Sequence, residues 1–233
     1  MKKKLILVIG IILLVISIAL GIHFYKYRTS DAYKFKKAYE EINNKVLFNN
    51  IKYQELNIPK NNKVKYSSLK ETIEVLENGT GLIYFGFPNC PWCRGMLPVL
   101  LDVVHCSCLE NVLYVDMTDM RDVFEVIDGK IVKKQEASEE YYKLLEIMDE
   151  ILSEYTIEKD GQIYEVGEKR IYVPLVVGVK NGEIVGAFET IELEEGQTAF
   201  DTLSEKQENE YRTNFEQIIE EITKQENVCT NHC

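Results

Sequence analysis

The chain begins with a long run of apolar residues. After Met1 and three lysines, residues 5–22 carry no charged side chain, and aromatic residues follow as they would at a membrane interface. A helix of this length rises about 27 Å, close to the hydrocarbon thickness of a bilayer. We predict a transmembrane anchor over residues 5–25, preceded by a short basic segment at 1–4. A cleavable signal peptide is the alternative, although its apolar core should be shorter, and a buried helix is a third interpretation.

The next segment, residues 26–58, is predicted to be a helical linker. Between positions 31 and 48, apolar side chains recur at helical spacing with charged residues between them. They are Phe35, Tyr39, Ile42 and Val46. A short strand over 53–58 is expected to end at Pro59, because proline cannot donate a hydrogen bond within a sheet.

Beyond residue 58 the chain alternates between continuous apolar runs, typical of buried strands, and apolar residues at helical spacing. The predicted elements are a helix from Ser68 to Gly79, strands over 81–87 and 111–117 with a helix over 91–109 between them, a helix over 138–155, a hairpin turning at Asn181-Gly182, and a last helix starting at Ser204. Turn sequences at 128–130 and 159–162 separate short extended pieces. We interpret residues 118–170 as an insertion without visible chemistry.

This order of elements predicts an α/β domain with a central mixed sheet flanked by helices. We place the domain over residues 59–228, followed by a cysteine-containing tail at 229–233. The chain is 45% hydrophobic, which is enough for a packed core. Its net charge of −11 repels phosphate backbones, so no nucleic-acid partner is expected.

The candidate chemistry lies in "FGFPNCPWCRGMLPVLLD", residues 85–102. Cys90 and Cys93 stand at a strand-to-helix junction, where this spacing puts the sulfurs about one turn apart, within reach of a disulfide. The first thiol faces free backbone N–H groups and the positive end of the helix dipole, which stabilise a thiolate. We therefore expect Cys90 to be a nucleophile and the more buried Cys93 to resolve the mixed disulfide. A structural disulfide and half of a zinc site are the alternatives.

Two segments resemble the thioredoxin superfamily. "YFGFPNCPWCRGMLPVLLDV" is similar to its active-site segment, and "VPLVVGVKNGEIVGAF" is similar to its cis-proline and terminal hairpin. The resemblance implies a thioredoxin-like fold in which Pro174 forms a cis bond beside the cysteines and Val173 offers backbone hydrogen bonds to an extended substrate. Pro98 is the family's helix proline, which kinks the active-site helix.

Other positions around the motif carry weaker expectations. Pro91 suits the first position of a helix, and Trp92 is expected to touch substrates or simply to pack. Tyr84 stands where the family keeps a buried acid, and Asn89 replaces a usual tryptophan. Since a tyrosine of pKa ~10 is a poor base at neutral pH, this departure argues against efficient thioredoxin-like reduction but not against thiol exchange. The insertion and the Cys-Pro-x-Cys motif are also similar to membrane-anchored bacterial thioredoxin-like proteins, including bacteriocin transport accessory proteins.

Four further cysteines lie far from the motif in the chain: Cys106, Cys108, Cys229 and Cys233. The resemblance places the ends of the active-site helix and the last helix side by side, so one or two structural disulfides are expected there. A zinc site that also uses His105 and His232, a second redox relay and free tail cysteines are the alternatives.

Together these observations predict a membrane-tethered thiol–disulfide oxidoreductase that acts on exported protein substrates and an unidentified membrane redox partner. Lys2 to Lys4 favour a cytoplasmic N-terminus, whereas basic residues just after the apolar run favour the opposite; the cysteine content supports a single-pass protein of the cell membrane with its soluble domain outside the cytoplasm. No cofactor and no resident metal ion is expected. A non-catalytic binding module on the same scaffold and a metal carrier using the distal cysteines remain alternatives.

Overall fold

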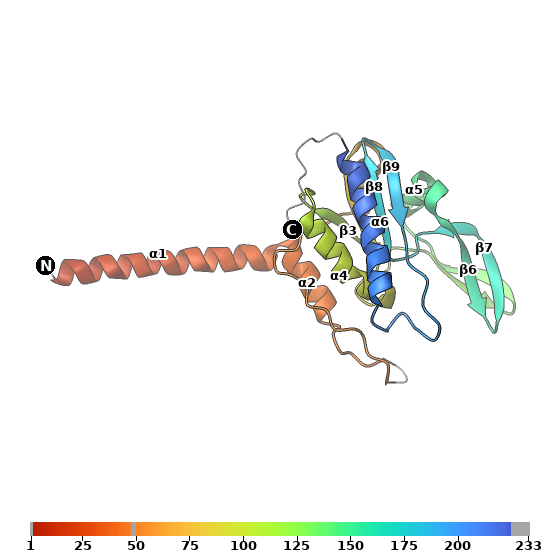
Figure 1. The fold of residues 1–233 in the computed structure, drawn as a ribbon, viewed down its shortest axis with the longest axis horizontal. Coiled ribbons are helices and arrows are strands. Elements are labelled where there is room, and N and C mark those ends of the chain that lie inside the picture. The colour runs from red at the N-terminus through yellow and green to blue at the C-terminus, as the bar shows by residue number, and fades with distance from the viewer. Residues whose placement is uncertain (1, 48–49, 225–233) are drawn as a thin grey trace.

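A five-stranded mixed sheet in the order β1-β3-β2-β8-β9 forms the centre of the computed structural model, which describes residues 2–47 and 50–224 (Figure 1). The strands are β1 (Val64–Tyr66), β2 (Gly81–Gly86), β3 (Val112–Asp116), β8 (Leu175–Lys180) and β9 (Glu183–Phe188). β1 and β2 run parallel to β3 between them, while β8 is antiparallel to both β2 and β9. β2 is therefore a central strand, as its continuous apolar run predicted.

Helices cover both faces of this sheet. The helices are α2 (Asp31–Glu40), α4 (Pro91–Cys106) and α6 (Glu205–Thr223) on one face, and α3 (Leu69–Asn78) and α5 (Glu139–Ile147) on the other. Successive β2 residues alternate between two hydrophobic cores, since Tyr84 packs with the first group of helices and Phe85 with the second. The predicted α/β class with a mixed central sheet flanked by helices is confirmed.

Local capping and turn chemistry fixes several boundaries. Ser68 and Glu71 form the predicted capping box, and Ser204 caps α6 in the same way. Asn181 and Gly182 join β8 to β9 with φ angles of 51° and 80°, as a two-residue hairpin turn requires. A Cβ at position 182 would also collide with the Glu77 carbonyl oxygen, so glycine is needed there for space as well.

The segment 118–170 forms two hairpins around α5. They are β4 (Val123–Ile127) with β5 (Lys130–Gln135) and β6 (Ser153–Lys159) with β7 (Gln162–Arg170). The predicted turns at 128–130 and 159–162 are confirmed, each with a glycine at positive φ. The helix predicted over 138–155 ends at Ile147 and is followed by a short 3-10 turn (Asp149–Ile151), because from Ser153 the sequence alternates between polar and apolar residues as a strand does.

The extension before β1 differs most from the sequence prediction. α2 stops at Glu40 instead of continuing to 48, and the strand predicted over 53–58 is absent from this described stretch. The Asn43 side chain replaces the missing strand partner, since it accepts a hydrogen bond from the Leu56 N–H at 2.9 Å and donates to the Leu56 carbonyl at 2.8 Å. Leu56 and Ile58 are consequently buried without a sheet.

The N-terminal helix α1 (Lys2–Thr29) extends away from the rest of the chain as a single rod (Figure 1). Its described apolar stretch, Ile12–Thr29, is long and apolar enough to cross a membrane, and none of it is buried against the protein. A signal sequence has the same length and composition, so this property fits both sequence interpretations.

A buried arginine holds the extension against α4. The Arg94 guanidinium is fully buried and donates hydrogen bonds to the Tyr39 carbonyl at 2.8 Å, the Gln54 carbonyl at 2.5 Å and the Asn43 side chain at 2.6 Å. It also lies 5.6 Å from the ring centroid of Tyr53. One side chain thus joins the end of α2 and the following loop to the first turns of α4.

Replacing Arg94 by alanine should destabilise the fold by about 2–4 kcal/mol, because two buried carbonyls lose their donor and a cavity is left. Urea unfolding of the detergent-solubilised chain measures the change. The matched control is Arg212→Ala on α6, whose guanidinium makes an exposed ion pair with Asp102 at 2.8 Å and should cost less than about 1 kcal/mol. Equal losses for the two variants would contradict the role given to Arg94.

Candidate functional site

The two motif cysteines lie where the central strand passes into α4. β2 ends at Gly86, a short loop follows, and Cys90 is the residue that caps the N-terminus of α4. Pro91 occupies the first helical turn, where its missing N–H costs nothing. The loop is held by a hydrogen bond from the Cys90 N–H to the Phe87 carbonyl at 3.1 Å and by one from the Tyr53 hydroxyl to the Asn89 carbonyl at 3.1 Å.

Cys90 stands between the helix and the residue before a cis-proline. Its sulfur accepts a hydrogen bond from the Cys93 N–H at 3.1 Å, in the way that a serine or aspartate caps a helix. The same sulfur donates to the Val173 carbonyl at 3.5 Å, and the Val173–Pro174 peptide bond is cis. The structure therefore brings Cys90 next to Val173, which lies 83 positions further along the chain.

The environment displaces the two thiol pKa values in opposite directions. A hydrogen bond from the Cys93 thiol is the largest cause that lowers the pKa of Cys90, and the N–H groups of Cys93 and Trp92 and the positive charge of Arg121 lower it further, while burial opposes them. Burial raises the pKa of Cys93 well above its usual range, and its hydrogen bond to Cys90 adds to this. Cys90 therefore ionises more easily than an ordinary cysteine, and Cys93 less easily.

A chain of buried hydroxyl groups lies beneath Cys93. The Tyr39 and Tyr84 hydroxyls are 2.8 Å apart, and both side chains are fully buried. The Tyr84 hydroxyl also acts on Cys93, since it lowers the pKa of that thiol against the effect of burial. Burial raises the pKa of Tyr84 well above its usual range, so its hydroxyl keeps the proton and can serve as a hydrogen-bond donor near the Cys93 sulfur.

Gly86 makes room for this arrangement. Tyr84 and Gly86 are two residues apart on β2, so they share one face of the sheet. A Cβ at position 86 would collide with the Tyr84 hydroxyl. The Tyr84 hydroxyl therefore lies against Gly86, near the end of its own strand.

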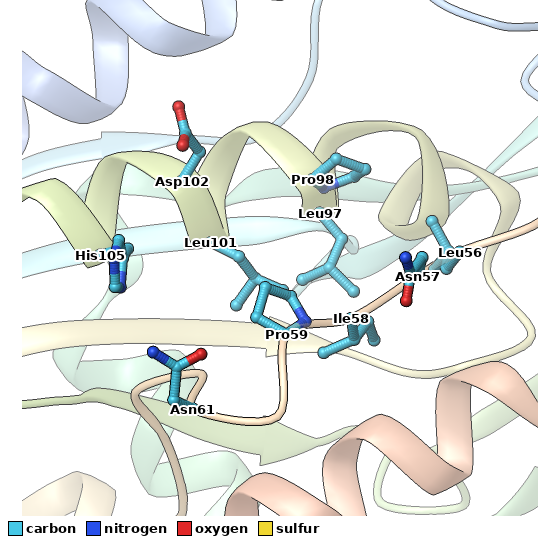
Figure 2. Close-up of a pocket in the computed structure, with 10 residues that line it drawn as sticks. All are labelled: Leu56, Asn57, Ile58, Pro59, Asn61, Leu97, Pro98, Leu101, Asp102 and His105. Atoms are coloured by element: carbon cyan, nitrogen blue, oxygen red, sulfur yellow. The ribbon is translucent and has the colours of Figure 1, made fainter. Parts of the chain in front are cut away.

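The remaining predicted site residues occupy different places. Trp92 is half-buried in the first turn of α4. Pro98 lies inside α4 with its ring exposed, and it lines an apolar pocket of about 270 Å³ between α4 and the segment 56–61 (Figure 2). That pocket, which ends at His105, lies along the helix away from Cys90 and contains neither motif cysteine.

The distal cysteines are at the other end of α4. Cys106 and Cys108 are both disulfide-bonded, and together with Glu220 and Thr223 of α6 they line one hollow, so the ends of α4 and α6 are neighbours. Cys229 and Cys233, the partners predicted from sequence, lie outside the described residues. Within residues 2–47 and 50–224, no three His, Cys, Asp or Glu side chains are grouped to hold a metal ion.

Sequence reasoning missed three contributors to the site. Arg94 follows Cys93 directly, but nothing in its sequence surroundings indicates that it is buried. Tyr39 appeared only as one apolar position of a helix, and Arg121 fell in the segment taken to have no chemistry. Each depends on contacts across more than 30 residues, which a local pattern does not contain.

Comparison with known proteins adds no independent assignment, because no protein-family model, curated protein or solved structure matches the chain.

Proposed function

We propose that this chain is a thiol–disulfide oxidoreductase with a thioredoxin-like fold, in which Cys90 is the nucleophile and Cys93 the resolving thiol. The observation that carries the proposal is the asymmetric pair: two thiols one helical turn apart, with the pKa of Cys90 lowered and that of Cys93 raised. Such asymmetry suits stepwise exchange, since one thiol must attack while the other keeps its proton.

The reaction proceeds in two exchanges that conserve atoms and electrons. The Cys90 thiolate attacks one sulfur of a substrate disulfide, so a Cys90–substrate bond forms and the other substrate sulfur leaves and takes a proton from solvent. Cys93 then loses its proton and attacks the Cys90 sulfur, which releases the second substrate thiol. Two electrons have passed to the substrate and a Cys90–Cys93 disulfide remains; the reverse sequence oxidises a dithiol substrate.

Two further features support this proposal. The two thiols and the residues before β8 lie together at one end of the sheet, and the Val173 carbonyl accepts a hydrogen bond from the Cys90 thiol. A substrate strand could use the backbone of Val173 for pairing once Cys90 is engaged. The mixed central sheet with helices on both faces also supports the proposed fold.

The position of α1 suits a membrane-tethered enzyme. The start of α2 lies beside residues 62–66, where Asp31 accepts from the Tyr66 N–H at 3.2 Å, and Lys63 donates to the Val104 carbonyl near the end of α4 at 3.1 Å. The end of α2 meets Arg94 in the first turns of α4. Because α1 leads into the start of α2, an anchored α1 would leave Cys90 at the end of the domain facing away from the bilayer.

Equilibration in glutathione buffers of graded redox ratio, followed by alkylation and mass spectrometry of each cysteine, tests the proposal. We expect Cys90 and Cys93 to titrate reversibly as one pair, while Cys106 and Cys108 stay oxidised over the same range. The midpoint then reports whether the enzyme tends to oxidise or to reduce its substrates. If Cys90 and Cys93 never form a reversible disulfide, the chain is a binding module and the enzymatic proposal fails.

The buried hydroxyl chain yields a kinetic prediction. Tyr84→Phe should slow release of the Cys90 mixed disulfide by about tenfold, because the Cys93 thiolate loses a hydrogen bond worth about 1.5 kcal/mol. Rapid-quench mass spectrometry of the mixed disulfide with glutathione measures this step. Tyr39→Phe, which removes a neighbouring hydroxyl without touching Cys93, is the matched control and should slow release less. Equal rates in Tyr84→Phe and the unmodified chain would refute the role of Tyr84.

A further inference from the structure

A small cavity beside the reactive cysteine is lined by the segment that seemed to carry no chemistry. Its volume is about 240 Å³, and it extends from the loop before Cys90 to the start of β4 and the end of β7. The lining residues include Phe87, Asn89, Asp119, Arg121, Asp122 and Arg170. Since Asn89 immediately precedes Cys90, a group bound here would lie next to a sulfur undergoing exchange.

The two arginines of this cavity differ in their partners. Arg170 holds the buried Asp122 carboxylate at 3.0 Å, so its charge is compensated. Among the described residues, no carboxylate lies within 4.0 Å of the Arg121 guanidinium. Its contacts are one long hydrogen bond to the Ile171 carbonyl at 3.4 Å and the face of the Phe87 ring, 5.4 Å from the centroid. Most of its donors are therefore available to a ligand.

The positive charge of Arg121 is not compensated by a neighbouring carboxylate among the described residues. Burial and the neighbouring charge of Arg170 lower the pKa of Arg121, and its positive charge reaches Cys90, whose pKa it lowers. Asp119 also lines the cavity, but this residue is exposed and its carboxylate is not paired with Arg121. A partly desolvated guanidinium with free donors is the arrangement that binds carboxylates most strongly.

We propose that this cavity is a specificity site in which Arg121 binds a carboxylate placed beside the reacting cysteine of a polypeptide substrate. The site gives the segment 118–170 a function, because it supplies both arginines. The carboxylate would neutralise Arg121 while the mixed disulfide forms at Cys90, so acidic sequences around the substrate cysteine would react faster than neutral ones. This inference rests on the proposed thiol exchange at Cys90.

The test compares disulfides that differ in charge but not in the exchange reaction. The reduced full chain in neutral detergent is mixed with 5,5′-dithiobis(2-nitrobenzoate), which carries carboxylates, and separately with neutral 4,4′-dithiodipyridine, and the first phase is followed by stopped-flow absorbance. We compare the rate with the carboxylate-bearing disulfide divided by the rate with the neutral disulfide. Arg121→Gln should lower this ratio about fivefold or more, since the lost contact is a charge-assisted hydrogen bond. A change in the reactivity of Cys90 itself alters both rates and leaves the ratio unaffected.

Two variants keep the result interpretable. Arg121→Lys retains the positive charge, so its rate ratio should stay close to that of the unmodified chain. Lys169→Gln removes one positive charge from the same strand as Arg170, but this lysine pairs with Asp149 at 3.0 Å and does not line the cavity, so the ratio should stay within about twofold of the unmodified chain. An unchanged ratio in Arg121→Gln, or an equal fall in Lys169→Gln, would overturn the proposal. If neither disulfide reacts with Cys90 in the unmodified chain, the proposed oxidoreductase function fails instead.

A second arm identifies the source of the carboxylate. Two cysteine peptides that differ only in a glutamate or glutamine beside the cysteine are presented as disulfides, alongside glutathione disulfide. We expect the preference for the glutamate peptide to disappear in Arg121→Gln. If the variant loses rate with glutathione disulfide but shows the same peptide preference as the unmodified chain, the site serves a small acidic thiol and the polypeptide proposal is wrong.

Discussion

The site depends on one constraint: the sulfur of Cys90 must cap the N-terminus of α4 while the thiol of Cys93, in the first turn of the same helix, is buried. A helix start supplies free N–H groups to the first sulfur, and the Cys93 N–H is bound to it at 3.1 Å. The second thiol lies inside the packed face of the same helix, where a charged form is costly. Because Cys90 lies at the helix start and Cys93 lies one turn further, inside the packed face, the pKa of Cys90 is lowered and that of Cys93 is raised. Arg121 and Tyr84 then adjust the pKa values of Cys90 and Cys93, respectively, which the helix start has already set apart.

Keeping that helix start in place requires support from outside the sheet. Arg94 fixes the first turns of α4 to the extension through the carbonyls of Tyr39 and Gln54, and Tyr53 holds the loop at Asn89. The extension also supplies Tyr39, which completes the hydroxyl chain below Cys93. A segment that the sequence suggested to be a linker thus helps to hold Cys90 and Cys93 in place. It joins the proposed membrane helix to the site through direct contacts.

The elements with strong local patterns could be predicted, and those built on long-range polar contacts could not. β2, the β8–β9 hairpin and α6 follow from continuous apolar runs, an Asn-Gly turn and a capping box, each contained within about twenty residues. Asn43 replaces a strand by hydrogen-bonding Leu56, and Arg94 is buried although arginine is usually exposed. Tyr84 was noted from sequence only as a poor base. Its value as a donor depends on the placement of Cys93 above it, which the sequence alone does not show.

The pH dependence of alkylation tests the central asymmetry most directly. The reduced chain is treated with iodoacetamide at a series of pH values, and modification of each cysteine is followed by mass spectrometry. Our account predicts that Cys90 reacts with a midpoint below the ordinary thiol pKa of about 8.5, while Cys93 resists until well above it. In urea both midpoints should return to the ordinary range, because the helix and the burial are lost. If Cys90 and Cys93 share one ordinary midpoint in the folded chain, the account is contradicted.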